Sequence, residues 1–169
     1  MRKPICAVAG GSSCSREEAA AAREVGRLLA EAGFAVATGG LGGVMEAASR
    51  GARDGGGLVL GLLPGTDAGD ANPFVDLALP TGLGDGRNAL VAASGDAMIA
   101  VGGGFGTLSE VALALKRGIP VVGLGTWNLD PGRLPPGGGI RDAATPEEAV
   151  RLVVEAVEIR NRGPRRGKG

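Results

Sequence analysis

The sequence predicts a single α/β domain with a mostly parallel sheet and helices on both of its faces. Short apolar runs alternate with longer segments of helical periodicity, which is typical of repeated strand-helix-strand units. The 169 residues are also a usual length for one domain, and the chain shows no internal repeat. We therefore assign residues 1–160 to one domain and residues 161–169 to a basic flexible tail.

Six apolar runs, each bounded by glycine, proline or polar residues, predict the strands of this sheet. They are Ile5–Ala9, Ala35–Thr38, Leu58–Leu62, Val75–Ala78, Ala97–Val101 and Val121–Leu124. A buried parallel sheet needs continuous apolar strands of this kind because both of its faces are covered.

Five longer segments predict the helices between and after these strands. They are Arg16–Ala32, Val44–Asp54, Gly86–Ala93, Leu108–Arg117 and a last helix from Pro146 to about Arg160. In the first of them Val25, Leu29 and Ala32 recur at helical spacing, and Gly33 provides the C-cap. The stretch from Trp127 to Gly139 holds three prolines and ends in three glycines, so we expect a surface loop there.

Charge argues against nucleic acid as a partner. The 18 basic and 18 acidic residues cancel, but five basic residues follow Ile159 with no acid among them. The preceding residues therefore carry about five net negative charges, which discourages nucleic-acid binding. Because glycine, proline and asparagine are interspersed in it, we interpret the basic end as a solvated tail rather than a nucleic-acid arm.

Composition also restricts the chemistry and the location. Two cysteines, Cys6 and Cys14, are too few for a disulfide framework. The first residues lead only into a short apolar run, so we expect no signal peptide and no membrane span. We therefore expect a cytoplasmic protein. The chain has no histidine, which excludes a Ser-His-Asp triad and a histidine-based metal site. We predict no metal site, and acid-base chemistry is left to carboxylates, arginine, lysine, cysteine or the ligand.

Glycine-rich loops follow several of the predicted strands. In a parallel sheet these strand-to-helix loops share the carboxyl edge, where such folds bind ligands. Glycine lets the backbone approach a ligand closely, and the free N–H groups of a helix start attract an anion. We therefore expect a phosphate-binding site at this edge rather than mere tight turns. The candidate residues are Gly10, Gly11, Ser12, Gly39, Gly40, Gly42, Gly43, Gly103, Gly104, Gly106 and Thr107.

Two common phosphate motifs are missing from these loops. None ends in the Gly-Lys-Ser/Thr of a P-loop, and neither glycine run completes G-x-G-x-x-G, because Met45 and Ser109 stand where the last glycine would be. A dinucleotide site or an ATP-hydrolysing site is therefore disfavoured. A smaller phosphorylated, nucleotide-like ligand fits the pattern better.

Arg87 and Glu110 are the candidate chemical groups of this edge. Each lies near the start of a helix that follows a strand, so both point to the carboxyl edge. An arginine can hold phosphate, and a carboxylate can stabilise a sugar cation or contact ribose hydroxyls. Two alternatives stay open: Glu110 can close a capping box with Thr107, and Arg87 can form a surface or interface salt bridge.

The residues from Gly86-Arg87-Asn88 through Gly102-Gly103-Gly104-Phe105-Gly106-Thr107-Leu108-Ser109-Glu110 resemble the Lonely Guy superfamily of Rossmann-like proteins. The resemblance covers nearly the whole domain and is strongest to the branch of molybdenum cofactor carrier-like proteins. Lonely Guy enzymes are phosphoribohydrolases that release the base from a nucleoside 5′-monophosphate. The resemblance implies catalytic roles for Arg87 and Glu110, with the 5′-phosphate held by Gly103, Gly104, Gly106 and Thr107.

Two departures from the enzyme motif point toward the carrier-like branch. Gly102 stands where the enzymes have proline, and Asn88, which we also place among the ligand-binding residues, stands where they have lysine. In carrier-like relatives the same edge is thought to hold a molybdopterin phosphate without turnover.

The resemblance leaves two functions open. The expected function is a phosphoribohydrolase that requires no cofactor, and the alternative is a non-catalytic carrier of the molybdenum cofactor. We also expect a homo-oligomer, a dimer or a tetramer, because apolar residues near Trp127 are candidates for an exposed face. The expected partner is thus a small phosphorylated ligand and a second copy of the chain, with no membrane.

Overall fold

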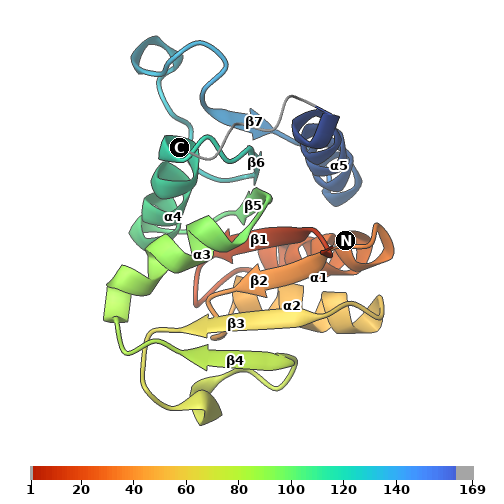
Figure 1. Cartoon of the computed structure of the whole chain (residues 1–169), viewed down its shortest axis with the longest axis vertical. Coiled ribbons are helices and arrows are strands. Elements are labelled where there is room, and N and C mark those ends of the chain that lie inside the picture. The colour runs from red at the N-terminus through yellow and green to blue at the C-terminus, as the bar shows by residue number, and fades with distance from the viewer. Residues whose placement is uncertain (1, 163–169) are drawn as a thin grey trace.

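The computed structural model describes residues 2–162, which form one sheet of seven strands with helices on both faces (Figure 1). All neighbouring strands run parallel, in the order β4-β3-β2-β1-β5-β6-β7. The predicted Rossmann-like α/β domain is confirmed, and its sheet is parallel throughout. No helix within residues 2–162 has the length and apolar character needed to cross a membrane.

The elements alternate along the chain as expected. The strands are β1 (Ile5–Gly10), β2 (Ala35–Thr38), β3 (Val59–Leu63), β4 (Leu77–Pro80), β5 (Ala97–Val101), β6 (Val121–Leu124) and β7 (Ile140–Asp142). The α-helices are α1 (Arg16–Glu31), α2 (Val44–Asp54), α3 (Asn88–Ser94), α4 (Phe105–Lys116) and α5 (Pro146–Arg162). Short 3-10 helices are η1 (Ala68–Asp70), η2 (Gly84–Arg87) and η3 (Pro131–Arg133).

Several boundaries differ from the sequence prediction, most of them by one or two residues. Strand β4 begins two residues later than expected, because the Val75 N–H bonds the Asn72 carbonyl in a turn before the strand. Helix α4 begins at Phe105 rather than Leu108. Strand β7 was not predicted as a strand, since it has only three residues and ends in two charged ones. Helix α5 runs two residues into the predicted tail, and residues 163–169 lie outside the described residues.

Alternating side chains of each strand pack into two layers of core. On β1, Cys6 and Val8 face one side, where α1, α2 and α5 cover the sheet. Ala7 faces the other side, where α3 and α4 pack. Both faces are therefore covered by helices over the centre of the sheet, which holds the strands rigidly in place.

The strand order creates a crevice at the carboxyl edge. The chain builds outward from β1 through β2 and β3 to β4, and then crosses back to add β5 on the opposite side of β1. Strands β1 and β5 are neighbours, but the loop after β1 leads to α1 on one face of the sheet and the loop after β5 leads to α4 on the other face. Ligands of open α/β sheets bind at such switch points.

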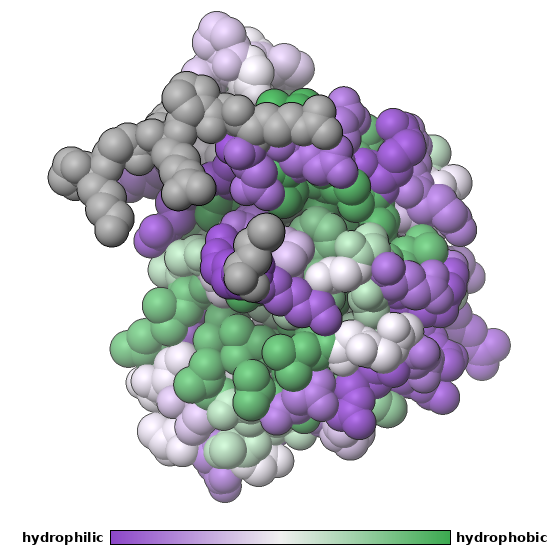
Figure 2. Space-filling view, turned by 45° about the vertical axis from the view of Figure 1, so that its right-hand side comes forward, coloured by the Kyte–Doolittle hydropathy of each residue, from purple (hydrophilic) through white to green (hydrophobic). Residues whose placement is uncertain are grey.

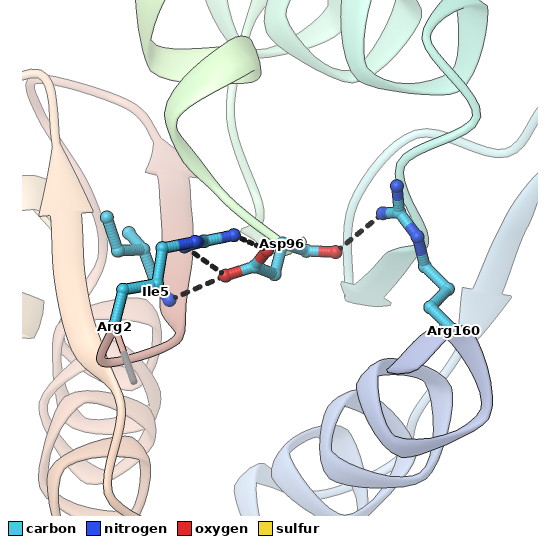
Figure 3. A network of polar contacts seen from close by, with 4 residues as sticks. All are labelled: Arg2, Ile5, Asp96 and Arg160. Carbon is cyan, nitrogen blue, oxygen red and sulfur yellow. Dashed lines mark hydrogen bonds and ion pairs between the residues drawn. The ribbon is translucent and has the colours of Figure 1, made fainter. Parts of the chain in front are cut away.

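Asp96 lies at the opposite, amino edge of the sheet, where it bonds to several segments of the chain (Figure 3). It directly precedes β5, so the sequence predicts a place away from the ligand edge and no catalytic role. Its carboxylate accepts hydrogen bonds from the Ile5 N–H and from the Arg2 guanidinium, both at 3.0 Å, and its carbonyl accepts one from Arg160 of α5 at 2.9 Å. Burial alone would raise its pKa, but these donors outweigh burial and hold the pKa of Asp96 below its usual value. The predicted position at the amino edge is confirmed.

Asp96→Asn is expected to lower the free energy of unfolding by about 1 kcal/mol, because the amide loses the charge-assisted bonds to a largely exposed Arg2. Affinity for phosphorylated ligands should stay unchanged, since the substitution lies at the far edge of the sheet. Urea denaturation and calorimetric titration of the same sample measure both effects. A clear loss of ligand affinity would contradict this placement of the site.

Candidate functional site

A cavity of about 620 Å³ opens at the carboxyl edge, in the crevice between the loops after β1 and β5. This volume lies in the usual range for small-molecule sites. Its wall includes every predicted site residue except four glycines of the second loop. The predicted residues that line it are Gly10, Gly11, Ser12, Arg87, Asn88, Gly103, Gly104, Gly106, Thr107 and Glu110.

The four glycines Gly39, Gly40, Gly42 and Gly43 pack behind the cavity instead of lining it. A β-carbon on Gly39 would lie 1.9 Å from Nη1 of Arg87, so the missing side chain makes room for the guanidinium. Gly43 has a φ of +63° and lies against the backbone of Ser12. The second loop contributes Leu41 and Met45 to the wall. Its glycines thus position the first loop and Arg87.

The start of α4 presents free backbone donors to the cavity. The N-cap residue, Gly104, makes no side-chain cap hydrogen bond, and the helix ladder begins with the Leu108 N–H bonded to the Gly104 carbonyl. Within residues 2–162 the N–H groups of residues 105–107 have no acceptor. Such groups, with the helix dipole behind them, form an anion site.

The loop before α4 owes its shape to Gly103. Its φ of +94° is a backbone conformation that side chains disfavour, and a β-carbon there would lie 2.3 Å from Oγ1 of Thr107. On the outer side, Thr126 Oγ1 donates to the Gly102 carbonyl at 2.6 Å and Trp127 Nε1 donates to the Gly104 carbonyl at 3.1 Å. These two bonds hold the loop of residues 102–104 in place.

Two other helix starts beside the cavity, those of α1 and α2, each have one N–H group bonded outside the helix. Ser15 caps α1 and forms a capping box with Glu18, as the sequence pattern predicts. At α2 the first N–H, that of Val44, donates to the Gly11 carbonyl of the neighbouring loop. Of these three helix starts, that of α4 has no N–H bonded to a cap side chain or to a neighbouring loop within residues 2–162.

Arg87 lies buried at the base of the cavity. Its Nη1 donates to the Leu62 carbonyl at 2.9 Å, and its Nε is buried with no partner in the described part of the chain. Burial lowers the pKa of Arg87, while the nearby charge of Glu110 acts in the opposite direction. The alternative of a surface salt bridge is wrong, because Arg87 is 9% exposed and forms no ion pair with another described residue.

Glu110 lies beside Arg87 and is also buried. The capping-box alternative is wrong, because α4 begins at Phe105 and Glu110 therefore lies in its second turn, too far along to reach the helix start. Burial raises the pKa of Glu110 to about 7, against the lowering effect of Arg87. Near neutral pH this carboxyl can therefore either donate or accept a proton.

Asn88 connects the third helix to the fourth. Its amide nitrogen donates to Ser109 Oγ at 2.9 Å, and Ser109 Oγ donates to the Gly106 carbonyl at 2.7 Å. The chain of bonds fixes the Asn88 side chain at the cavity wall, next to Arg87.

Six lining residues were not predicted from the sequence: Ser13, Glu18, Leu41, Met45, Pro64 and Asp85. A usable signal existed for Glu18, because a capping box at the first helix places that carboxylate at the carboxyl edge. With Asp85 and Glu110 it gives the wall three acidic side chains against one arginine. An anionic ligand must therefore rely on the backbone donors of α4 in addition to Arg87.

Comparison with known proteins points to one group. The model of the SLOG cluster4 family matches residues 3–150. An uncharacterized protein of Archaeoglobus fulgidus is 42% identical over 151 residues, which cover 88% of this chain and 93% of that protein.

Solved structures of similar proteins point to the same group. The molybdenum cofactor binding protein of Rippkaea orientalis has a TM-score of 0.85 and 39% identity, covering 93% of this chain and 99% of that one. The Moco carrier protein of Chlamydomonas reinhardtii has a TM-score of 0.82 and 37% identity, covering 94% of this chain and 99% of that one.

Proposed function

This chain belongs to the SLOG cluster4 family, and from that premise we propose that it binds the molybdenum cofactor through its phosphate and carries it without converting it. The observation that supports this proposal most is the similarity, over nearly the whole length, to a molybdenum cofactor binding protein and to a Moco carrier protein. The resemblance found in the sequence is confirmed at the level of the family, and the carrier alternative is better supported than the hydrolase.

The cavity suits a phosphorylated pterin. The start of α4 supplies backbone N–H donors for the phosphate. Asn88 and a protonated Glu110 supply polar groups for a heterocycle, and Leu41 and Met45 supply apolar wall. The volume of about 620 Å³ accommodates a ligand larger than phosphate alone.

The backbone at Gly102 supports a loop different from that of the resembling hydrolases. Its φ is +50°, which proline cannot adopt because its ring fixes φ near −65°. A β-carbon at Gly102 would also meet Oε1 of Glu18 at 1.8 Å. A chain with proline here therefore needs another path for this loop, and the glycine fits the carrier-like departure.

A retention experiment tests the carrier proposal. Purified protein is incubated without oxygen with molybdenum cofactor released from a molybdoenzyme, and is then separated from free cofactor by gel filtration. We expect cofactor to elute with the protein and to be recovered unchanged, with its pterin measured by fluorescence after oxidation. Elution of all pterin in the free fraction would contradict the proposal.

Phosphoribohydrolase activity is the second candidate, and the pair formed by Arg87 and Glu110 favours it. In such a reaction the bond from the sugar to the base breaks, the base leaves with the bonding electrons and a proton, and water supplies the hydroxyl on the sugar. An ionised Glu110 would stabilise the developing sugar cation, and Arg87 would hold the phosphate. Chromatography of a panel of nucleoside 5′-monophosphates after incubation measures released base, of which the carrier proposal predicts none.

We also propose that the protein is a homo-oligomer that associates through the open part of the sheet face bearing α3 and α4. Leu77 and Leu79 of β4 lie on that face, because they pair with Leu60 and Leu62 of β3. They are 53% and 50% exposed, and two further exposed leucines follow in the chain, one just before η2 and one in α3: Leu83 and Leu90. Figure 2 shows hydrophobic residues gathered in the lower half of the molecule, at the height where Figure 1 places β3 and β4. A parallel sheet needs both faces covered, and a second copy about a two-fold axis supplies the same apolar surface.

Leu79→Glu is expected to convert a dimer or tetramer into monomers, because it places a charge in the centre of the proposed interface. Sedimentation velocity of the two proteins at equal concentration measures the effect. Ile159→Glu, at an exposed residue of α5, which covers the opposite face of the sheet, is the matched control and should leave the mass unchanged. A monomeric unmodified protein at tens of micromolar would contradict the proposal.

A further inference from the structure

Phe105 stands exposed beside the anion site. It is the first residue of α4 and is 82% exposed, and both of its chain neighbours, Gly104 and Gly106, line the cavity. The whole chain has only four aromatic residues, three phenylalanines and one tryptophan. Two of them meet here, because the ring of Phe105 stacks on that of Trp127 with centroids 5.6 Å apart and planes inclined by 30°. Neither a core nor a turn requires this arrangement.

The pair is fixed to the loop that forms the anion site. The indole N–H of Trp127 donates to the Gly104 carbonyl, and the preceding residue, Thr126, donates to the Gly102 carbonyl. One side of the Phe105 ring is thus supported by an anchored indole. An aromatic ring held in this way loses little conformational entropy when a second ring stacks on it.

From this geometry we infer that Phe105, supported by Trp127, is a stacking surface for the flat heteroaromatic ring of the ligand whose phosphate binds at the start of α4. The inference rests on the phosphate-binding part of the proposed function and adds the residue that recognises the ring. The same residue that offers its N–H to the phosphate carries the exposed ring, and a nucleotide or a pterin monophosphate has one group for each of these two features. Stacking is tolerant of ring type, because each of these heterocycles has a π-face.

Calorimetric titration of the full-length protein with four probes tests the inference. Guanosine 5′-monophosphate and a pterin monophosphate carry a ring, whereas ribose 5-phosphate and inorganic phosphate do not. Phe105→Ala is expected to weaken binding of the two ring-bearing probes by about tenfold and to leave the other two within about twofold. The probe that loses more affinity identifies the ring, purine or pterin, that the surface prefers.

Two further variants separate stacking from structural effects. Phe105→Tyr keeps an aromatic face and should retain the affinity of the unmodified protein. Trp127→Phe keeps a ring behind Phe105 but removes the N–H bond to Gly104 that holds the anion loop. A small loss for all four probes is therefore expected, and it should be larger for the two ring-bearing ones. Because Phe105 is exposed, these proteins should remain folded, which near-ultraviolet circular dichroism checks.

The outcomes distinguish failure of ring stacking at Phe105 from failure of the proposed function. Equal losses for all four probes in Phe105→Ala would overturn stacking in favour of a role in shaping the helix start. Unchanged affinity for every probe would place the ring elsewhere in the cavity and would also overturn the inference, while leaving the proposed function intact. If the unmodified protein binds none of the four probes and no molybdenum cofactor, the proposed function fails first and the inference with it.

Discussion

Glu110→Gln is expected to raise the free energy of unfolding by roughly 3 kcal/mol at pH 8, because a pKa of about 7 in place of the usual 4.5 measures the cost of an ionised carboxylate at this site. Glutamine has nearly the same shape and no charge to bury. The attraction between Glu110 and Arg87 reduces this cost but does not remove it. The substitution therefore stabilises the fold.

The stabilisation by Glu110→Gln should depend on pH. The folded protein binds the Glu110 proton more tightly than the unfolded chain does, so its stability is greatest below pH 4.5 and falls as the pH rises to about 7. Glutamine removes this fall, and the two proteins should converge at low pH. Urea denaturation at pH 5, 6, 7 and 8 measures the difference, and the exposed Glu147→Gln on α5 is the control, with little change expected. A stability difference that does not grow with pH would contradict the buried ionisation.

A residue that lowers stability in the wall of a cavity is a functional candidate, since its retention needs another reason than folding. The two functions then predict different consequences of the same substitution. A phosphoribohydrolase would lose base release in Glu110→Gln and keep nucleotide binding, because only the transition state carries the sugar cation. A carrier would release no base in either form, and its affinity for phosphorylated pterin would lose the dependence on pH that Glu110 gives it.

The sequence was sufficient for the arrangement of the fold and for most of the cavity wall. Apolar runs separated by amphipathic helices determine a parallel sheet, and in such a sheet the loops after β1 and β5 can only meet at the carboxyl edge. The placement of Arg87 and Glu110 followed from the same rule, without any knowledge of side-chain contacts. Local pattern and global topology therefore agree at this site.

What the sequence could not show depends on contacts between distant segments. The run Thr107-Leu108-Ser109-Glu110 has the pattern of a capping box, but α4 starts at Phe105, which carries Glu110 into the buried second turn. Likewise the glycines from 39 to 43 have the composition of a ligand loop, yet Gly39 is small because Arg87, 48 residues later in the chain, needs the space. Neither fact is encoded by spacing alone.

Gly103→Ala is expected to cost at least about 2 kcal/mol of stability and to weaken phosphate binding at least about tenfold. Two effects add at this position. The φ of +94° strains any side chain, and the new β-carbon would approach the buried Thr107 side chain to 2.3 Å. The loop must therefore move, and the N–H groups at the start of α4 lose the alignment on which anion binding depends. Chemical denaturation and titration with inorganic phosphate measure the two losses.

Gly118→Ala, at the other end of the same helix, separates these effects. Gly118 has a comparable φ of +67°, but a β-carbon there would meet nothing within 4 Å. This variant should cost only the backbone strain, about 1 kcal/mol, and leave phosphate affinity unchanged. Because both glycines flank α4, a loss of affinity in both variants would indicate a general loosening of the helix. A loss confined to Gly103→Ala assigns phosphate binding to the N-terminal loop, and full affinity in Gly103→Ala would exclude it.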